Sequence, residues 1–111
     1  MTESIDTSMI EELKMLMEEE FPMLIETYVQ DCDQRIEGLA SALSSSDSGK
    51  VRELAHAFKG SSSNLGAQKL ADICFELETM GRDDQLAGAP ATFETLKAEY
   101  QAVRGYYLSL I

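Results

Sequence analysis

The sequence is poor in the residues around which metal and redox sites are built. Its 111 residues include one histidine, two cysteines, two prolines and no tryptophan. Cys32 and Cys74 lie far apart and match no metal-binding or redox spacing. Both fall on apolar helical stripes, so we expect buried free thiols. A single histidine supplies neither a metal cluster nor a convincing nucleophile–base pair, which disfavours a metal-dependent or hydrolytic enzyme.

Positive charge is also scarce. Nine Lys and Arg residues stand against 20 Asp and Glu residues, which gives a formal net charge of −11 at pH 7. This excess of acid repels phosphates, so neither nucleic acid nor an anionic membrane surface is an expected partner. No apolar run approaches the roughly 20 residues of a membrane span. The acidic, polar N-terminus is unlike a signal peptide, so we expect a cytoplasmic protein. The sequence leaves the oligomeric state open, and a monomer is the default expectation.

Hydrophobic periodicity predicts helices along the whole chain and no convincing strand. The expected helices cover about residues 8–19, 22–43, 50–65, 67–80 and 91–110. Ser8 and Glu11 fit a capping box at the start of the first helix. Gly66 and Gly81 are placed to end the third and the fourth. We expect one domain over residues 1–111, an all-α antiparallel up-down-up-down four-helix bundle with the short first helix as a lid.

The lone histidine lies on the third expected helix. On a helical wheel with 100° per residue, the apolar side chains of this helix fall opposite His56. Four other residues share the side of the histidine, namely Arg52, Lys59, Gly60 and Ser63. An exposed histidine is usually ordinary surface. The character of these neighbours indicates otherwise.

Each neighbour suits a histidine that carries a phosphoryl group. Gly60 costs roughly 1 kcal/mol relative to alanine inside a helix, and its missing side chain lets another protein approach the imidazole. The ammonium of Lys59 can balance the charge of a phosphoryl group. Ser63 can donate a hydrogen bond to it, whereas we take the two preceding serines as structural. Neutral imidazole is a good nucleophile near pH 7, so His56 is the candidate phosphoacceptor.

Basic residues gather around this histidine. From Lys50 to Lys69, four cations accompany one acid, Glu53, so the window sums to +3 and leaves −14 for the rest of a chain of net charge −11. Such a patch would meet a phosphoryl group or the acidic pocket of a partner. Chance clustering on a solvated face would look the same.

Methionine is concentrated near the N-terminus, and methionine adapts to different partner surfaces. We expect an apolar docking pad beside the histidine, made by the first helix and the start of the second, with one basic contact from the third. The expected partner-binding residues are Met9, Leu13, Met17, Leu24 and Arg52. The four apolar side chains could equally just cover the end of the bundle.

Together these residues form a motif that resembles the histidine-containing phosphotransfer (Hpt) domain: His56-x-x-Lys59-Gly60-Ser61-Ser62-x-x-x-Gly66-Ala67, followed by Leu70 and Glu78. The resemblance covers the whole chain. It implies a four-helix bundle in which His56 is phosphorylated on Nε2, Lys59 stabilises the phosphoryl group and Gly60 leaves room for a partner.

The resemblance also implies the partners and the cofactors. A stand-alone Hpt protein relays phosphoryl groups between receiver domains of hybrid sensor histidine kinases and response regulators. It has no cofactor of its own, and Mg²⁺ is expected on the receiver domain. Such a protein generally lacks kinase activity, in agreement with the absence of a phosphate-cradling Gly-rich loop from this sequence.

Two functions of different classes stay open. The first is a phosphorelay carrier. The second is a helical adaptor that binds a receiver or kinase domain and is never phosphorylated. The combination of His56, Lys59 and Gly60 favours the carrier, because an adaptor needs no nucleophile.

Overall fold

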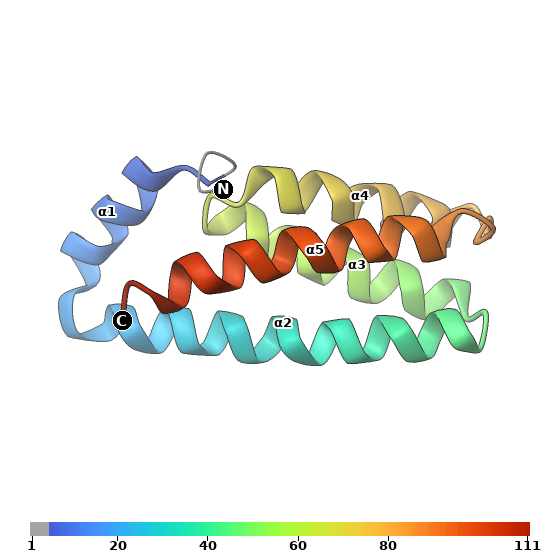
Figure 1. The fold of residues 1–111 in the computed structure, drawn as a ribbon, viewed down its shortest axis with the longest axis horizontal. Coiled ribbons are helices and arrows are strands. Elements are labelled where there is room, and N and C mark those ends of the chain that lie inside the picture. The colour runs from blue at the N-terminus through green and yellow to red at the C-terminus, as the bar shows by residue number, and fades with distance from the viewer. Residues whose placement is uncertain (1–4) are drawn as a thin grey trace.

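A computed structural model describes residues 5–111. Its elements are α1 (Thr7–Met17), a short 3-10 helix η2 (Glu18–Glu20), α2 (Phe21–Ser44), α3 (Ser48–Asn64), α4 (Gln68–Arg82) and α5 (Ala89–Leu108). Helices α2 to α5 lie side by side with alternating direction, and α1 leans across one end of them (Figure 1). The expected all-α four-helix bundle with an extra N-terminal helix is confirmed. Each end of the expected helices lies within two residues of the observed one.

Aromatic side chains fill much of the core between the helices. Phe58 of α3 packs edge-on against Tyr100 of α5, with ring centroids 5.6 Å apart. Tyr28 of α2 packs in the same way against Tyr107 of α5, at 5.4 Å. The hydroxyl of Tyr107 donates to the carbonyl oxygen of Leu65 at 2.6 Å, beside the turn between α3 and α4. These contacts tie α5 to α2 and, across the core, to α3 and the turn that follows it.

The two cysteines are buried, as expected. Cys32 lies on α2 and Cys74 on α4, and both are free thiols. Burial raises the pKa of Cys32 to about 11 and that of Cys74 to about 12. Both therefore stay protonated near neutral pH and behave as small apolar core residues.

The cap of α1 differs from the expectation. Asp6, and not Ser8, is the N-cap, and its carboxylate accepts a hydrogen bond from the amide of Met9 at 3.1 Å. Aspartate caps as well as serine does, so residue type alone could not separate the two candidates. The amide of Asp6 also donates to the carbonyl oxygen of Gly66 at 2.9 Å. Gly66 has φ of +81°, the left-handed conformation expected for the residue that ends α3.

Gly81 does not end α4 as expected. It lies inside that helix, which continues to Arg82, and it is buried against the first turns of α3. A Cβ at this position would lie 2.7 Å from the amide nitrogen of Arg52 and 2.8 Å from the carbonyl oxygen of Ser48. The glycine therefore serves close approach of two helix backbones, and the residue with positive φ after α4 is Asp84, at 54°.

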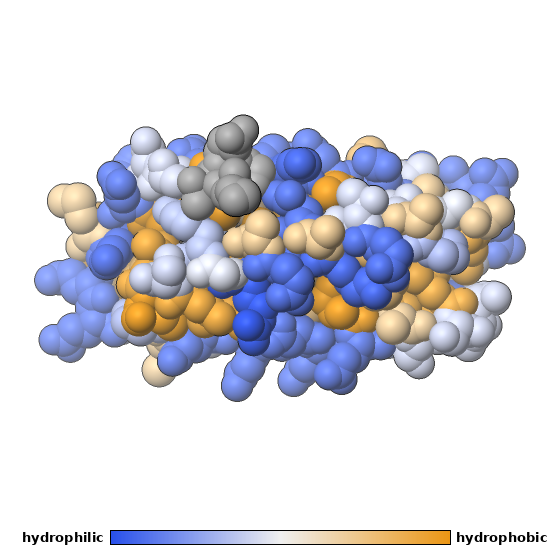
Figure 2. All heavy atoms as spheres, viewed as in Figure 1, coloured by the Kyte–Doolittle hydropathy of each residue, from blue (hydrophilic) through white to orange (hydrophobic). Residues whose placement is uncertain are grey.

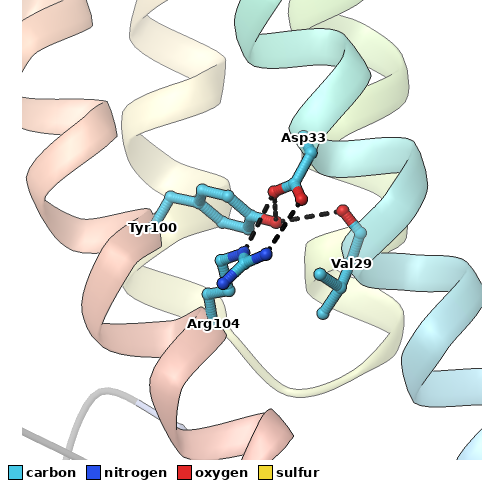
Figure 3. A network of polar contacts seen from close by, with 4 residues as sticks. All are labelled: Val29, Asp33, Tyr100 and Arg104. Carbon is cyan, nitrogen blue, oxygen red and sulfur yellow. Dashed lines mark hydrogen bonds and ion pairs between the residues drawn. The ribbon is translucent and has the colours of Figure 1, made fainter.

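A polar cluster joins α2 to α5 on one side of the bundle (Figure 3). The Tyr100 hydroxyl donates to Asp33 Oδ1 at 2.7 Å and lies 3.2 Å from the carbonyl oxygen of Val29. Arg104 donates to both oxygens of Asp33, each at 3.1 Å. Burial by itself would raise the pKa of Asp33, but the bonds from Arg104 and Tyr100 outweigh it and lower that pKa. The cluster locks the two helices in register.

The outer surface is largely polar. On the face over α5 and α2, Figure 2 shows mostly hydrophilic side chains with apolar atoms visible between them. Within residues 5–111, none of the helices combines the length and the apolar composition that crossing a bilayer requires.

Candidate functional site

His56 lies in the middle of α3 with 68% of its side chain exposed. Its Nδ1 is 2.9 Å from Oε2 of Glu78, a residue of the neighbouring helix α4. In the described part of the chain no hydrogen bond reaches the other ring nitrogen, Nε2. A neutral imidazole with its proton on Nδ1 donates to the carboxylate and keeps the lone pair on Nε2 for chemistry.

Glu78 connects the histidine to the lysine. Its second oxygen, Oε1, is 2.8 Å from the ammonium of Lys59, and its side chain is only 13% exposed. Burial alone would raise the pKa of Glu78, but the contacts with Lys59 and His56 outweigh it and hold that pKa below its ordinary value. The carboxylate therefore stays charged at neutral pH and binds both groups on α3.

Space is open at the glycine one turn beyond the histidine. A Cβ added to Gly60 would meet nothing within 4 Å. The packing of this chain therefore does not require glycine there, although glycine weakens the helix. Clearance for a partner at Gly60 stays a prediction.

Residues 23–106 match the family model described as the Hpt domain. The chain belongs to the Hpt family. It is 39% identical to histidine-containing phosphotransfer protein B from Pseudomonas aeruginosa PAO1, whose crystal structure superposes with a TM-score of 0.90 over 95% of this chain and 91% of that one. It is also 30% identical over 99 residues to histidine-containing phosphotransfer protein 4 from Arabidopsis thaliana, covering 84% of this chain and 78% of that protein.

Family membership confirms the resemblance and the functional class. The chain is a histidine phosphotransfer protein of phosphorelay signalling. Hpt proteins are phosphocarriers and not kinases, and they work with receiver domains and histidine kinases. The non-phosphorylated adaptor is correspondingly disfavoured.

Three serines follow Gly60 in this Hpt domain, and they have different surroundings. Ser62 is buried and shares a hydrogen bond of 2.8 Å with the hydroxyl of Tyr28. Ser61 accepts from Arg35 at 3.2 Å and donates to the carbonyl oxygen of Phe58 at the same distance. Both are structural. Ser63 is exposed on the side of Gly60, where it stays a predicted partner of the phosphoryl group.

Two shallow hollows flank the site. One, of about 330 Å³, brings Arg52 to the histidine and is lined by Gly49, Arg52, Glu53, His56 and Glu78. The other, of about 470 Å³, lies toward the end of α3 and is lined by Lys59, Gly60, Ser63, Asn64, Gln68, Ala71, Asp72 and Phe75. Every residue predicted from the third helix thus lines one of the two hollows.

The predicted docking pad lies apart from this arrangement. Met9 packs beside Gly66, which follows His56 by ten residues, or about 15 Å along a helix. Leu13, Met17 and Leu24 are half-buried against the core at the end that α1 covers. Only Arg52 among the five predicted partner-binding residues borders the hollow at His56. The pad itself stays a prediction.

The positive patch is weaker than its formal charge. Lys59 lies against Glu78 at 2.8 Å and Lys69 against Glu99 at 3.7 Å, so carboxylates from outside the +3 window offset two of its cations. Lys50 pairs with Glu53 at 3.5 Å. Three of the four cations of the window are therefore in ion pairs.

Glu78 is the residue whose role the sequence did not reveal. It stands in the motif, but nothing along the chain pairs it with His56 and Lys59, which lie 22 and 19 residues earlier. The pairing depends on the antiparallel register of α3 and α4, which the close approach at Gly81 helps to set.

Proposed function

We propose that this protein is a cytoplasmic, monomeric carrier that accepts a phosphoryl group on Nε2 of His56 and passes it on, with no kinase activity of its own. The partners are receiver domains of hybrid sensor histidine kinases and of response regulators, and each receiver supplies the Mg²⁺ and the phosphorylated aspartate. The observation that carries the proposal is the 2.9 Å contact between His56 Nδ1 and Glu78 on a ring that is otherwise exposed.

The transfer step follows from that contact. The Nε2 lone pair attacks the phosphorus of the aspartyl phosphate, an N–P bond forms, and the bond between phosphorus and the aspartate oxygen breaks. The aspartate leaves as a carboxylate. The proton stays on Nδ1, where Glu78 stabilises the positive charge that develops on the ring, so no base is needed. Transfer to the next receiver is the reverse sequence with a different aspartate.

Charge compensation is the second requirement. Phosphoryl transfer depends on positioning and on neutralising the charge of the equatorial oxygens more than on proton chemistry. Lys59 contributes one ammonium from the same helix, one turn from His56. One cation does not suffice, so the proposal assigns the rest to the Mg²⁺ of the receiver. The open backbone at Gly60 is the side from which that receiver approaches.

Incubation with a receiver that carries a radiolabelled aspartyl phosphate tests the proposal. We expect acid-labile, alkali-stable label on the wild-type chain and none on His56→Gln. The free energy of unfolding of the variant should lie within about 0.5 kcal/mol of the wild-type value, because an exposed side chain contributes little to stability. Label that persists in His56→Gln would contradict the assignment. A wild-type chain that binds the receiver and takes no label would support the adaptor instead.

A further inference from the structure

Phe75 is an apolar side chain in an unusual place. In residues 5–111, five large apolar side chains are exposed: Met15, Leu16, Met23, Phe75 and Ile111. Four of them lie at the end of the bundle that α1 and the C-terminus share (Figure 1). Phe75, with 49% of the residue exposed, instead lies on α4 in the hollow that Lys59 and Gly60 line.

The ring of Phe75 contacts the lysine of the site. The Lys59 ammonium is 4.9 Å from the ring centroid, within the range of a cation–π interaction. The same ammonium is 2.8 Å from Oε1 of Glu78. Phe75 and Glu78 are three residues apart on α4 and hence on one face of it. In this single position the ammonium contacts an aromatic face and a carboxylate of α4 at the same time.

The ammonium of Lys59 meets the carboxylate of Glu78 at a single oxygen. In the described part of the chain this contact is the 2.8 Å ion pair with Oε1. The carboxylate that lines the hollow of Lys59 and Phe75, Asp72, accepts a hydrogen bond from Gln68 at 2.8 Å. The lysine stem is flexible, and the ion pair by itself leaves the position of its ammonium loosely defined.

The contacts of the Lys59 ammonium with Phe75 and with Glu78 have different consequences for phosphoryl transfer. A phosphoryl group on Nε2 lies on the side of the imidazole away from Glu78, which binds Nδ1. To bind the phosphoryl oxygens, the ammonium turns at least one of its three N–H donors away from Glu78 and toward Nε2. An aromatic face holds a cation without accepting its N–H groups and without cancelling its charge. A lysine on Phe75 is close by and keeps its donors available.

We propose that Phe75 is a positioning residue: its ring keeps the Lys59 ammonium beside His56, poised to move from Glu78 to the phosphoryl group. Phe75 touches no reacting atom and acts through Lys59. The inference rests on the proposed role of His56 as phosphoacceptor and adds to it a residue that controls the rate of transfer.

The test compares Phe75→Leu, which keeps apolar volume and removes the ring, with Phe75→Tyr, which keeps the ring. Phosphoryl transfer from a labelled receiver is followed over a range of receiver concentrations. We expect Phe75→Leu to lower the saturating rate about two- to fivefold, the size of an exposed cation–π contact, with an unchanged KM. Phe75→Tyr should restore the wild-type rate. Phe75→Met replaces the leucine variant if that one fails to fold.

A double-mutant cycle, in which Phe75→Leu is also made in the Lys59→Met background, separates a positioning role of Phe75 from a role in docking the receiver. If Phe75 acts through Lys59, Phe75→Leu has no further effect on the rate in that background. A rise in KM, or an equal loss of rate with and without Lys59, would overturn the inference and indicate contact with the receiver instead. Wild-type rates in Phe75→Leu would overturn it and leave the role of His56 intact. If the wild type takes no label, the proposed function fails and this inference fails with it.

Discussion

Two sides of the bundle use similar chemical groups for different ends. Between α2 and α5, Asp33 is held by Arg104 and Tyr100, and both of its oxygens accept aligned hydrogen bonds (Figure 3). Between α3 and α4, Glu78 is shared by His56 and Lys59, and each of its oxygens has one of these partners, at 2.9 and 2.8 Å. A carboxylate with a cation and a third group thus makes a structural cluster between α2 and α5 and the candidate site between α3 and α4.

The nature of the cation decides between the two outcomes. Arginine presents a planar fork that binds both oxygens of a carboxylate at once, and this geometry fixes the pair. Lysine is a point charge on a flexible stem and can move to another anion without breaking a two-point contact. The histidine ring in turn has a second nitrogen with no partner in residues 5–111. It is this free ring nitrogen of the α3–α4 cluster to which our proposal assigns the phosphoryl group. In the α2–α5 cluster, both oxygens of Asp33 are bound by Arg104.

The largest expected effect comes from forcing α3 and α4 apart. Gly81→Ala would place a Cβ 2.7 Å from the amide nitrogen of Arg52 and 2.8 Å from the carbonyl oxygen of Ser48, both backbone atoms that cannot rotate away. We expect a loss of about 2 kcal/mol in the free energy of unfolding, net of the better helix propensity of alanine. Because α3 and α4 would move apart, Glu78 would lie farther from His56, and the rate of phosphoryl transfer should fall too.

Urea titration and a transfer assay check both halves of this prediction. A stable Gly81→Ala protein with wild-type transfer would mean that the backbones have room to spare. A destabilised protein with wild-type transfer would mean that the His56–Glu78 contact does not depend on this close approach.

The next largest effect on the free energy of unfolding is expected in the cluster of Asp33, Tyr100 and Arg104. Tyr100→Phe removes a hydroxyl that donates to Asp33, and it leaves one aligned hydrogen bond fewer between α2 and α5. We expect the free energy of unfolding to drop by about 1 to 1.5 kcal/mol, the usual net value of such a bond. Phosphoryl transfer at a temperature well below the melting point should not change. A slower transfer in the folded variant would show that the two sides of the bundle are coupled.

Helix periodicity carried most of the fold prediction. The seam of α5, from Phe93 through Tyr100 to Tyr107, alternates in steps that only a buried helical face explains, and these residues are buried. Where two residues satisfied the same local rule, local rules could not choose between them. Asp6 caps α1 in place of Ser8, and it is also bonded through its amide to Gly66, a tertiary contact that no local pattern contains.

The site was predictable along one helix and not across two. His56, Lys59 and Gly60 lie on one face of α3, so spacing alone brings them together. Glu78 and Phe75 reach them only through the register of α4 against α3. The prediction that Gly81 ends α4 was wrong for the same reason. In the sequence, a glycine required by the close backbone of another helix cannot be told from a glycine that ends its own helix.

A smaller effect separates clearance from helix stability. Gly60 and Gly105 are both exposed and helical, and a Cβ at either would meet nothing within 4 Å. Alanine at each position should therefore add about 0.5 to 1 kcal/mol to the free energy of unfolding. Only Gly60→Ala should slow transfer to and from receivers, because only that position lies beside His56. Equal transfer rates in both variants would remove clearance as the reason for Gly60, and Gly105→Ala is the matched control.

The smallest expected effect is in the acid range, where both carboxylates titrate. Their contacts lower the pKa of Asp33 and of Glu78 below the values that these groups have in the unfolded chain, about 3.9 for Asp and 4.3 for Glu. The stability from each is present above the unfolded value and is lost as the pH falls through the lower, folded value. Solvent screening keeps the contribution of the half-exposed Asp33 below about 1 kcal/mol. We therefore expect Asp33→Asn and Glu78→Gln to be less stable than the wild type in urea at pH 6, with the difference fading near pH 3. A difference that stays constant between pH 6 and pH 3 would mean that packing, and not charge, holds the two clusters together.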